Sequence, residues 1–204
     1  MDLSANDVMG AVRLHMGEPV DATTATVTVL VGSAIFLVGA GIGVPRVFTE
    51  PDRARKLRML DEQIVRWRVA QPLYAIGPLV AGTGVGLLAA EVGPGSPRIW
   101  IALSCLLLLA GALLWSWSVY LRGRRVREFA LGELPGWPFA SYVWSTLAGL
   151  ALLGVGLLDA GFAAWTGWLT LVGVLAFLMM YIRLRDIPPF VFYVLLPVVS
   201  LGWL

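Results

Sequence analysis

A charged stretch from Arg46 to Arg68 interrupts an otherwise apolar chain, and it constrains the fold more than any other feature. It holds seven of the 15 lysine and arginine residues, including the only lysine, Lys56, and long apolar runs flank it on both sides. A segment with this charge density cannot lie in hydrocarbon, so we expect a loop outside the bilayer. Lysine and arginine are concentrated in the cytoplasmic loops of membrane proteins, which predicts that this loop is cytoplasmic.

The overall composition is typical of a membrane protein. Hydrophobic residues make up 58% of the 204 residues and charged residues only 14%, compared with roughly 25% charged residues in soluble domains. The mean hydropathy of +0.81 agrees with this class. A net charge of +2 could suit a nucleic-acid partner, but the basic residues lie in loops between apolar runs, as membrane insertion requires. We therefore expect no nucleic-acid binding.

Six apolar runs follow a polar N-terminal segment, residues 1–25, which we expect outside the bilayer. Each run has about the 20 residues that a helix needs to cross the hydrocarbon, the last one at the short limit. The loops between them are too short to form a second domain. The sequence thus predicts one all-α transmembrane domain of six helices over residues 26–204, with the amphipathic loop 46–68 on its inner side. The runs cover about 24–44, 69–92, 98–121, 139–158, 162–182 and 187–204.

Basic residues are distributed very unevenly between the two ends of the predicted helices. Thirteen of the 15 fall in the loops after the first, third and fifth runs, whereas only Arg13 and Arg98 lie on the opposite side. Because positive charge marks cytoplasmic loops, we predict that both termini lie on the outer, non-cytoplasmic side of a bacterial-type plasma membrane (a cell inner membrane).

An internal similarity suggests two parallel helical hairpins. The pattern Gly-Val-Gly-Leu-Leu begins at Gly84 in the second run and recurs at Gly154 in the fourth. The third and fifth runs both close on a Tyr-x-Arg pattern. This predicts a repeat of helices two–three and four–five, flanked by helices one and six. The alternative is convergence, since Gly, Leu and Val are common in all membrane helices.

The charged loop itself predicts an amphipathic helix. Thr49 reads as an N-cap, Pro51 stands early in the first turn and Asp52 follows. Apolar residues then recur on one face, at Leu57, Leu60, Ile64 and Trp67, and cations occupy the rest. We expect this helix to lie at the inner headgroup level and to contact anionic lipid, or alternatively to dock a partner protein. The residues predicted to contact lipid headgroups or a partner are Arg53, Arg55, Lys56, Arg58 and Arg66.

Two glycine pairs predict close helix packing. Gly39 and Gly43 in the first run, and Gly82 and Gly86 in the second, are spaced one turn apart, which lets a neighbouring backbone approach closely. Pro78 lies inside the second predicted helix and is expected to kink it.

Residue types that carry most membrane chemistry are scarce. The chain has one histidine, His15, and one cysteine, Cys105, and no lysine in any predicted span. This composition excludes bis-histidine haem ligation within one chain, a retinal Schiff base and dithiol chemistry. Ionisable residues stand only at the ends of the runs, whereas ion and proton pathways place them inside the membrane. We predict no catalytic residues, no metal site, no cofactor and no enzymatic activity.

Elimination leaves two functional classes. The first is a non-catalytic accessory or assembly subunit of a larger membrane complex (respiratory, photosynthetic or transport), which needs only packing surfaces and has other membrane subunits as partners. The alternative is a small membrane carrier or binder of an apolar molecule such as a lipid, quinone or pigment. Its pocket would lie between helices near Pro78 and three tryptophans that fall deeper than the predicted membrane interfaces, Trp115, Trp117 and Trp144.

Overall fold

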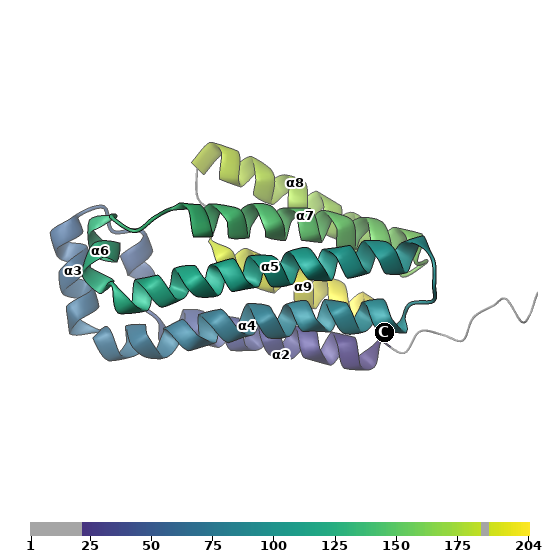
Figure 1. The fold of residues 1–204 in the computed structure, drawn as a ribbon, viewed down its shortest axis with the longest axis horizontal. Helices are drawn as coiled ribbons and strands as arrows, with labels where there is room; N and C mark the ends of the chain where they lie inside the picture. The colour runs from purple at the N-terminus through teal and green to yellow at the C-terminus, as the bar shows by residue number, and fades with distance from the viewer. Residues whose placement is uncertain (1–21, 185–187) are drawn as a thin grey trace, which may run out of the picture.

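A computed structural model describes residues 22–184 and 188–204 of the chain, and these residues form a bundle of helices without a β-strand (Figure 1). Residues 1–21 of the predicted N-terminal segment therefore lie outside the described part of the chain. In chain order the elements are α2 (Thr23–Ile42), η1 (Pro45–Phe48), α3 (Arg53–Glu62), α4 (Ile64–Glu91), α5 (Ser96–Arg124), α6 (Val126–Leu131), α7 (Trp137–Asp159), α8 (Ala164–Leu184), η2 (Pro189–Val191), α9 (Phe192–Ser200) and η3 (Leu201–Trp203).

Five helices, α2, α4, α5, α7 and α8, are long and apolar enough to cross a membrane. They are compatible with the predicted multi-pass membrane protein. The sixth predicted span is shorter: the apolar segment is Pro189–Trp203, which at about 1.5 Å per residue reaches about 23 Å, less than the ~30 Å of the hydrocarbon. The segment consists of η2, α9 and η3, so only Phe192–Ser200 is α-helical, and Pro197 lies inside that helix.

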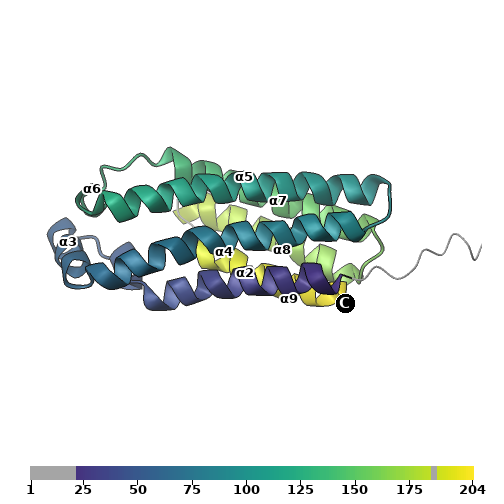
Figure 2. The ribbon, with the colours of Figure 1, turned by 60° about the horizontal axis from the view of Figure 1, so that its bottom comes forward.

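The short α9 is nevertheless buried in the bundle. It lies beside α2 (Figure 2), and the Thr26 hydroxyl donates a hydrogen bond of 3.1 Å to the Ser200 carbonyl. Phe192, Tyr193 and Leu196 of α9 have almost no exposed surface. The C-terminus therefore lies at the same end of the bundle as the start of α2 (Figure 1).

The long helices pack in the order α2–α4–α5–α7–α8, so α4–α5 and α7–α8 form the two predicted hairpins. The two hairpins differ in burial. Half of the most apolar part of α4 is buried, whereas α8 lies at the edge of the bundle and only 11% of its most apolar part is buried. Short turns between consecutive helices are sufficient to place them side by side and antiparallel, so these two hairpins do not by themselves indicate a repeat. The duplication of the hairpins stays a prediction.

Glycines set the contact between α2 and α4. An added Cβ at Gly39 would lie 2.9 Å from the Leu73 Cβ, and one at Gly43 would lie 2.8 Å from the Tyr74 hydroxyl. The tightest contact is at Gly32 and Gly77, which the sequence analysis did not single out: a Cβ at Gly32 would overlap the Ala81 backbone nitrogen. On the α5 side, a Cβ at Gly82 or Gly86 would lie 2.9 Å from Leu109 or Cys105.

The charged loop folds differently from the single amphipathic helix that we predicted. Asp52, not Thr49, caps α3, because its carboxylate accepts hydrogen bonds from the Ala54 and Arg55 amides at 2.8 and 3.2 Å. The helix then breaks at Gln63, and Trp67 belongs to the first turns of α4. Together η1, α3 and α6, with the links around them (residues 44–62 and 125–136), cover one end of the bundle, seen on the left in Figure 1. We call this part the end cap.

The apolar face of this loop packs inside the protein rather than against lipid. Leu60 and Trp67 are both 0% exposed, and with Val44, Val47 and Ala130 they form a small core separate from the main one. α6 and η1 thus cover the surface that we expected to meet the bilayer. The prediction failed here because an amphipathic pattern indicates that one face is covered, but not by what.

Candidate functional site

The centre of the bundle is filled by aromatic rings. Phe36 of α2 stacks on Tyr193 of α9, with 4.1 Å between ring centroids, and Trp115 of α5 lies 5.0 Å from Tyr142 of α7. Trp115 Nε1 donates to the Tyr74 carbonyl at 2.9 Å, and the hydroxyls of Tyr142 and Tyr193 are 3.3 Å apart. Five helices each contribute a ring to this cluster.

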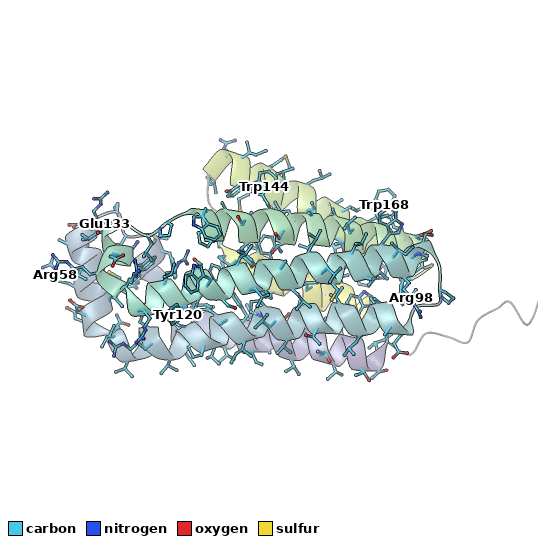
Figure 3. The ribbon with its side chains drawn as sticks, viewed as in Figure 1. Arg58, Arg98, Tyr120, Glu133, Trp144 and Trp168 are labelled. Carbon is cyan, nitrogen blue, oxygen red and sulfur yellow. The ribbon has the colours of Figure 1, made fainter. Side chains whose placement is uncertain are left out.

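The three tryptophans proposed to line an apolar pocket do not converge. Trp115 is buried in the aromatic cluster, whereas Trp117 is exposed and stacks on Tyr120 at 5.6 Å. Trp144 is also exposed, and it meets Tyr181 of α8 edge-on at 5.8 Å. Figure 3 shows Trp144 between α7 and α8, away from Tyr120 on α5. They therefore line no common pocket.

Helix α8 is attached to the bundle far more weakly than the other long helices. Of its 21 residues only Thr166, Gly167 and Thr170 are buried. These three lie near its start, where an added Cβ at Gly167 would meet Leu158 and the Gly154 carbonyl of α7. Toward its other end α8 diverges from α7 (Figure 1), and large rings such as Tyr181 and Phe177 maintain the contact with Trp144 and Phe192.

A pocket of about 230 Å³ opens where the end cap meets the bundle, and we call it the basic pocket. α3 and the last turns of α5 supply its polar side chains, while the link between α6 and α7 supplies four lining residues, and Leu121, Phe129 and Phe139 add apolar side chains. Within residues 22–184 and 188–204 its lining residues include no acid. They are Lys56, Ser118, Leu121, Arg122, Phe129, Gly132, Leu134, Pro135, Gly136 and Phe139.

Arg122 is surrounded by aromatic rings. Its Cζ lies 5.0 Å from the ring centroid of Trp115 and 5.5 Å from that of Phe129. Phe139 and Phe48 follow at 5.6 and 5.9 Å. All four distances are within the range of cation–π attraction, about 6 Å. The rings come from η1, α5, α6 and α7, so Arg122 ties the end cap to the bundle.

Lys56 approaches the same ring as Arg122. Its Nζ lies 4.5 Å from the centroid of Phe129. Burial, and then the nearby positive charge of Arg122, lower the pKa of the Lys56 ammonium below its ordinary value. Two cations thus converge on one partly buried site, at the ring of Phe129.

Of the five cations predicted to contact lipid headgroups or a partner, only Lys56 lines the basic pocket. Arg53, Arg55 and Arg58 are exposed on α3, and Arg55 forms an ion pair with Glu50 at 3.3 Å. Arg66 instead donates from Nε to the Ile42 carbonyl at 3.0 Å and so holds the end of α2. Their contact with lipid or a partner stays a prediction.

The sequence analysis missed Ser118 and Arg122. It used Arg122 only as a marker of a helix end. The signal was present, because Trp115, Ser118 and Arg122 are spaced by three and four residues, which places them on one face of a helix. The rings of Phe129 and Phe139 come from later segments, and no pattern in the sequence links them to this face.

No His, Cys, Asp or Glu side chains gather in groups that could hold a metal ion within residues 22–184 and 188–204. The chain matches no protein-family model, and no curated protein or solved structure is significantly similar to it. The geometry described above is therefore the basis for any assignment of function.

Proposed function

We propose that this chain is a non-catalytic integral membrane protein that acts as an accessory or assembly subunit of a larger membrane complex. Its end cap faces the cytoplasm, and the exposed side of α8 packs against a transmembrane helix of a different polypeptide. The observation that carries the proposal is the weak attachment of α8: 11% of its most apolar part is buried, against 33–56% for the other four long helices.

The exposed side of α8 is large and apolar along its whole length. It presents Trp168, Val172, Leu175, Met179 and Ile182, each 59–66% exposed, and Figure 3 shows Trp168 at the end opposite the end cap. Helices in membranes associate by van der Waals packing and hydrogen bonds rather than by the hydrophobic effect. A helix with so few contacts to its own bundle gains most from a second surface of this kind.

The exposed side of α5 supplies a matched comparison. Leu106 of α5 is 63% exposed and Leu175 of α8 is 59% exposed, and both lie within apolar spans. α5, however, is held by α4 on one side and α7 on the other. Lipid alone suffices as a neighbour for the exposed strip of α5, so exposure of a leucine does not by itself indicate a partner.

The aromatic cluster supports a subunit over a carrier of an apolar molecule. Phe36, Trp115, Tyr142 and Tyr193 occupy the space between the helices near the level proposed for a pocket, and each is less than 5% exposed. A carrier would need these rings to move apart to admit a lipid, quinone or pigment.

The test is the mass and composition of the protein extracted gently from its native membrane. We expect a stoichiometric complex with at least one other polypeptide. Leu175→Trp should dissociate it, because a small-to-large change in a packed interface costs about 1–3 kcal/mol. Leu106→Trp should leave the complex intact. A monomer or homo-oligomer in the wild type, or equal effects of the two substitutions, contradicts the proposal.

A further inference from the structure

The backbone of α4 is interrupted near its middle. Pro78 lies inside this helix and is buried. Proline has no amide hydrogen, so position 78 cannot donate to the carbonyl four residues earlier, which is that of Tyr74. A backbone carbonyl without a donor is costly inside a membrane, and neighbouring helices commonly supply the replacement. The interruption therefore calls for a donor from outside α4.

Trp115 of α5 supplies this donor. Its Nε1 donates to the Tyr74 carbonyl at 2.9 Å, and the bond is buried. A second, longer contact lies beside it, because the Ser116 hydroxyl donates to the Ala75 carbonyl at 3.4 Å. Two consecutive residues of α5 thus face two consecutive carbonyls of α4. Both contacts fall on the turn that Pro78 interrupts.

Packed rings fix the direction of the Trp115 indole. The side chain is 3% exposed, and the ring of Tyr142 lies 5.0 Å away and that of Phe139 6.0 Å away. The Arg122 guanidinium lies 5.0 Å from the centroid of the Trp115 ring. Trp115 therefore contacts both the interrupted turn of α4 and the residue that ties the end cap to the bundle.

A second tryptophan makes the reciprocal bond. Trp67, in the first turns of α4, donates from Nε1 to the Arg122 carbonyl of α5 at 3.3 Å. Residues 64–77, which we call the cap-side half of α4, are therefore bonded to α5 at two levels. Trp67 also belongs to the small core of the end cap, and Figure 1 shows α4 running from the end cap to the opposite end of the bundle. A movement of the cap-side half would carry the end cap with it.

Gly77 directly precedes the proline and meets α2. An added Cβ at Gly77 would lie 2.7 Å from the Phe36 Cβ, so α2 touches this turn but finds no side chain on Gly77 to hold. Proline and glycine are common where helices bend or pivot. The turn at Gly77 and Pro78 is therefore a point at which α4 itself ties its two halves together weakly.

We propose that Gly77 and Pro78 form a hinge in α4 and that the bond from Trp115 to the Tyr74 carbonyl is its latch. While the latch is closed, the two halves of α4 move as one helix. When it opens, the cap-side half and the end cap tilt relative to the other half. The inference is independent of the proposed subunit function, because it involves α4 and α5 and no residue of α8.

The test is a cycle of two substitutions in the full-length chain, with the unfolding equilibrium constant measured in mixed micelles of increasing SDS content. Trp115→Phe keeps a ring but removes the donor, so it should raise the unfolding constant about tenfold to a hundredfold. Pro78→Ala restores an amide that can donate to the Tyr74 carbonyl. In that background the effect of Trp115→Phe should be smaller by about fivefold or more. The loss of ring size acts equally in both backgrounds and cancels.

Two matched controls isolate the bond. Trp117→Phe is the same substitution two residues further along α5, but Trp117 is 49% exposed and stacks on Tyr120, so the unfolding constant should change by about twofold or less. Pro72→Ala removes the other proline inside α4, which is exposed. It restores an amide opposite the Arg68 carbonyl, so it should leave the effect of Trp115→Phe unchanged.

Hydrogen exchange of Trp115→Phe alone provides a second measurement, which does not require that Pro78→Ala folds. Amides of the cap-side half should exchange about tenfold faster or more, whereas those of residues 79–91 should change little. Equal effects of Trp115→Phe with and without Pro78→Ala would overturn the proposal. So would a rescue by Pro72→Ala, or faster exchange along the whole of α4.

Discussion

Trp67 tests whether the end cap is a folded unit or a surface helix at the lipid interface. Its side chain is 0% exposed, stacks on Phe129 at 5.1 Å and donates from Nε1 to the Arg122 carbonyl at 3.3 Å. Replacing a fully buried tryptophan with alanine costs about 3–5 kcal/mol, which combines lost burial with a cavity. If Trp67 instead lay in the headgroup region, its replacement would affect lipid binding more than the folding of the cap.

Hydrogen exchange of the purified protein in detergent gives the measurement. In Trp67→Ala the amides of α3 and α6 should exchange about a hundredfold or more faster, up to the free energy of opening of the cap itself. The amides of α5 and α7 should change little, because the small core around Trp67 is separate from the main one. Trp67→Phe keeps a ring but loses the hydrogen bond and should cost less.

The control is Val65→Ala in the same segment, since Val65 is 71% exposed. A surface substitution of this kind stays within about 0.5 kcal/mol. If Trp67→Ala and Val65→Ala increase exchange in α3 and α6 equally, the cap core does not exist as described. If exchange rises over the whole bundle instead, the cap and the bundle are one cooperative unit and our separation of the two cores is wrong.

Three further outcomes follow from the structure. Gly32→Val should reduce the yield of folded protein in size-exclusion chromatography, because its Cβ would overlap the backbone of α4, whereas Gly41→Val, with nothing within 4 Å, should not. In a Cys105→Ala background, a cysteine that replaces Ser96 or Ala163 should react with impermeant maleimide from outside the cell, whereas one that replaces Ala54 should react only after lysis. Labelling of the Ala54→Cys variant in intact cells would reverse the predicted topology. The pKa of Lys56 is lower in the folded protein than its ordinary value of 10.5, so between these two values the unfolded chain binds more protons than the folded one. The free energy of unfolding therefore increases as pH rises through that window. The unfolding temperature of the wild type relative to Lys56→Gln should rise from pH 8 to pH 10, and a constant difference would contradict this.

The long helices could be predicted from the sequence because a single physical requirement acts on them. Every backbone polar group in hydrocarbon must be satisfied within its own segment, so an apolar run of sufficient length indicates a helix without any knowledge of its neighbours. Runs one to five match α2, α4, α5, α7 and α8 within a few residues at most ends. The second and third helices extend further, to Ile64 and Arg124, because the loop residues beside them continue the helix into the end cap.

The sixth segment shows where this reasoning stops. Hydropathy counts apolar residues, but it does not show that only Phe192–Ser200 is α-helical here, between two 3₁₀ turns. α9 is shorter than a bilayer and is still buried, because α2 and α8 pack against it. Neither the length of the α-helix nor its enclosure by neighbouring helices changes the mean hydropathy of the run, so the sequence alone could not predict the short, buried α9.

The basic pocket could not be predicted for a different reason. Its cations come from segments that are 66 positions apart, Lys56 and Arg122, and each belongs to a cluster of basic residues that the charge asymmetry of the chain already explains. The predicted topology requires positive charge at this end of the bundle but not at any one position. Only the folding of α6 back onto α3, which brings the Phe129 ring within 4.5 Å of Lys56 Nζ and 5.5 Å of Arg122 Cζ, distinguishes them from the exposed arginines around them. A charge that serves insertion and a charge that packs against the rings of the cap therefore look alike in the sequence.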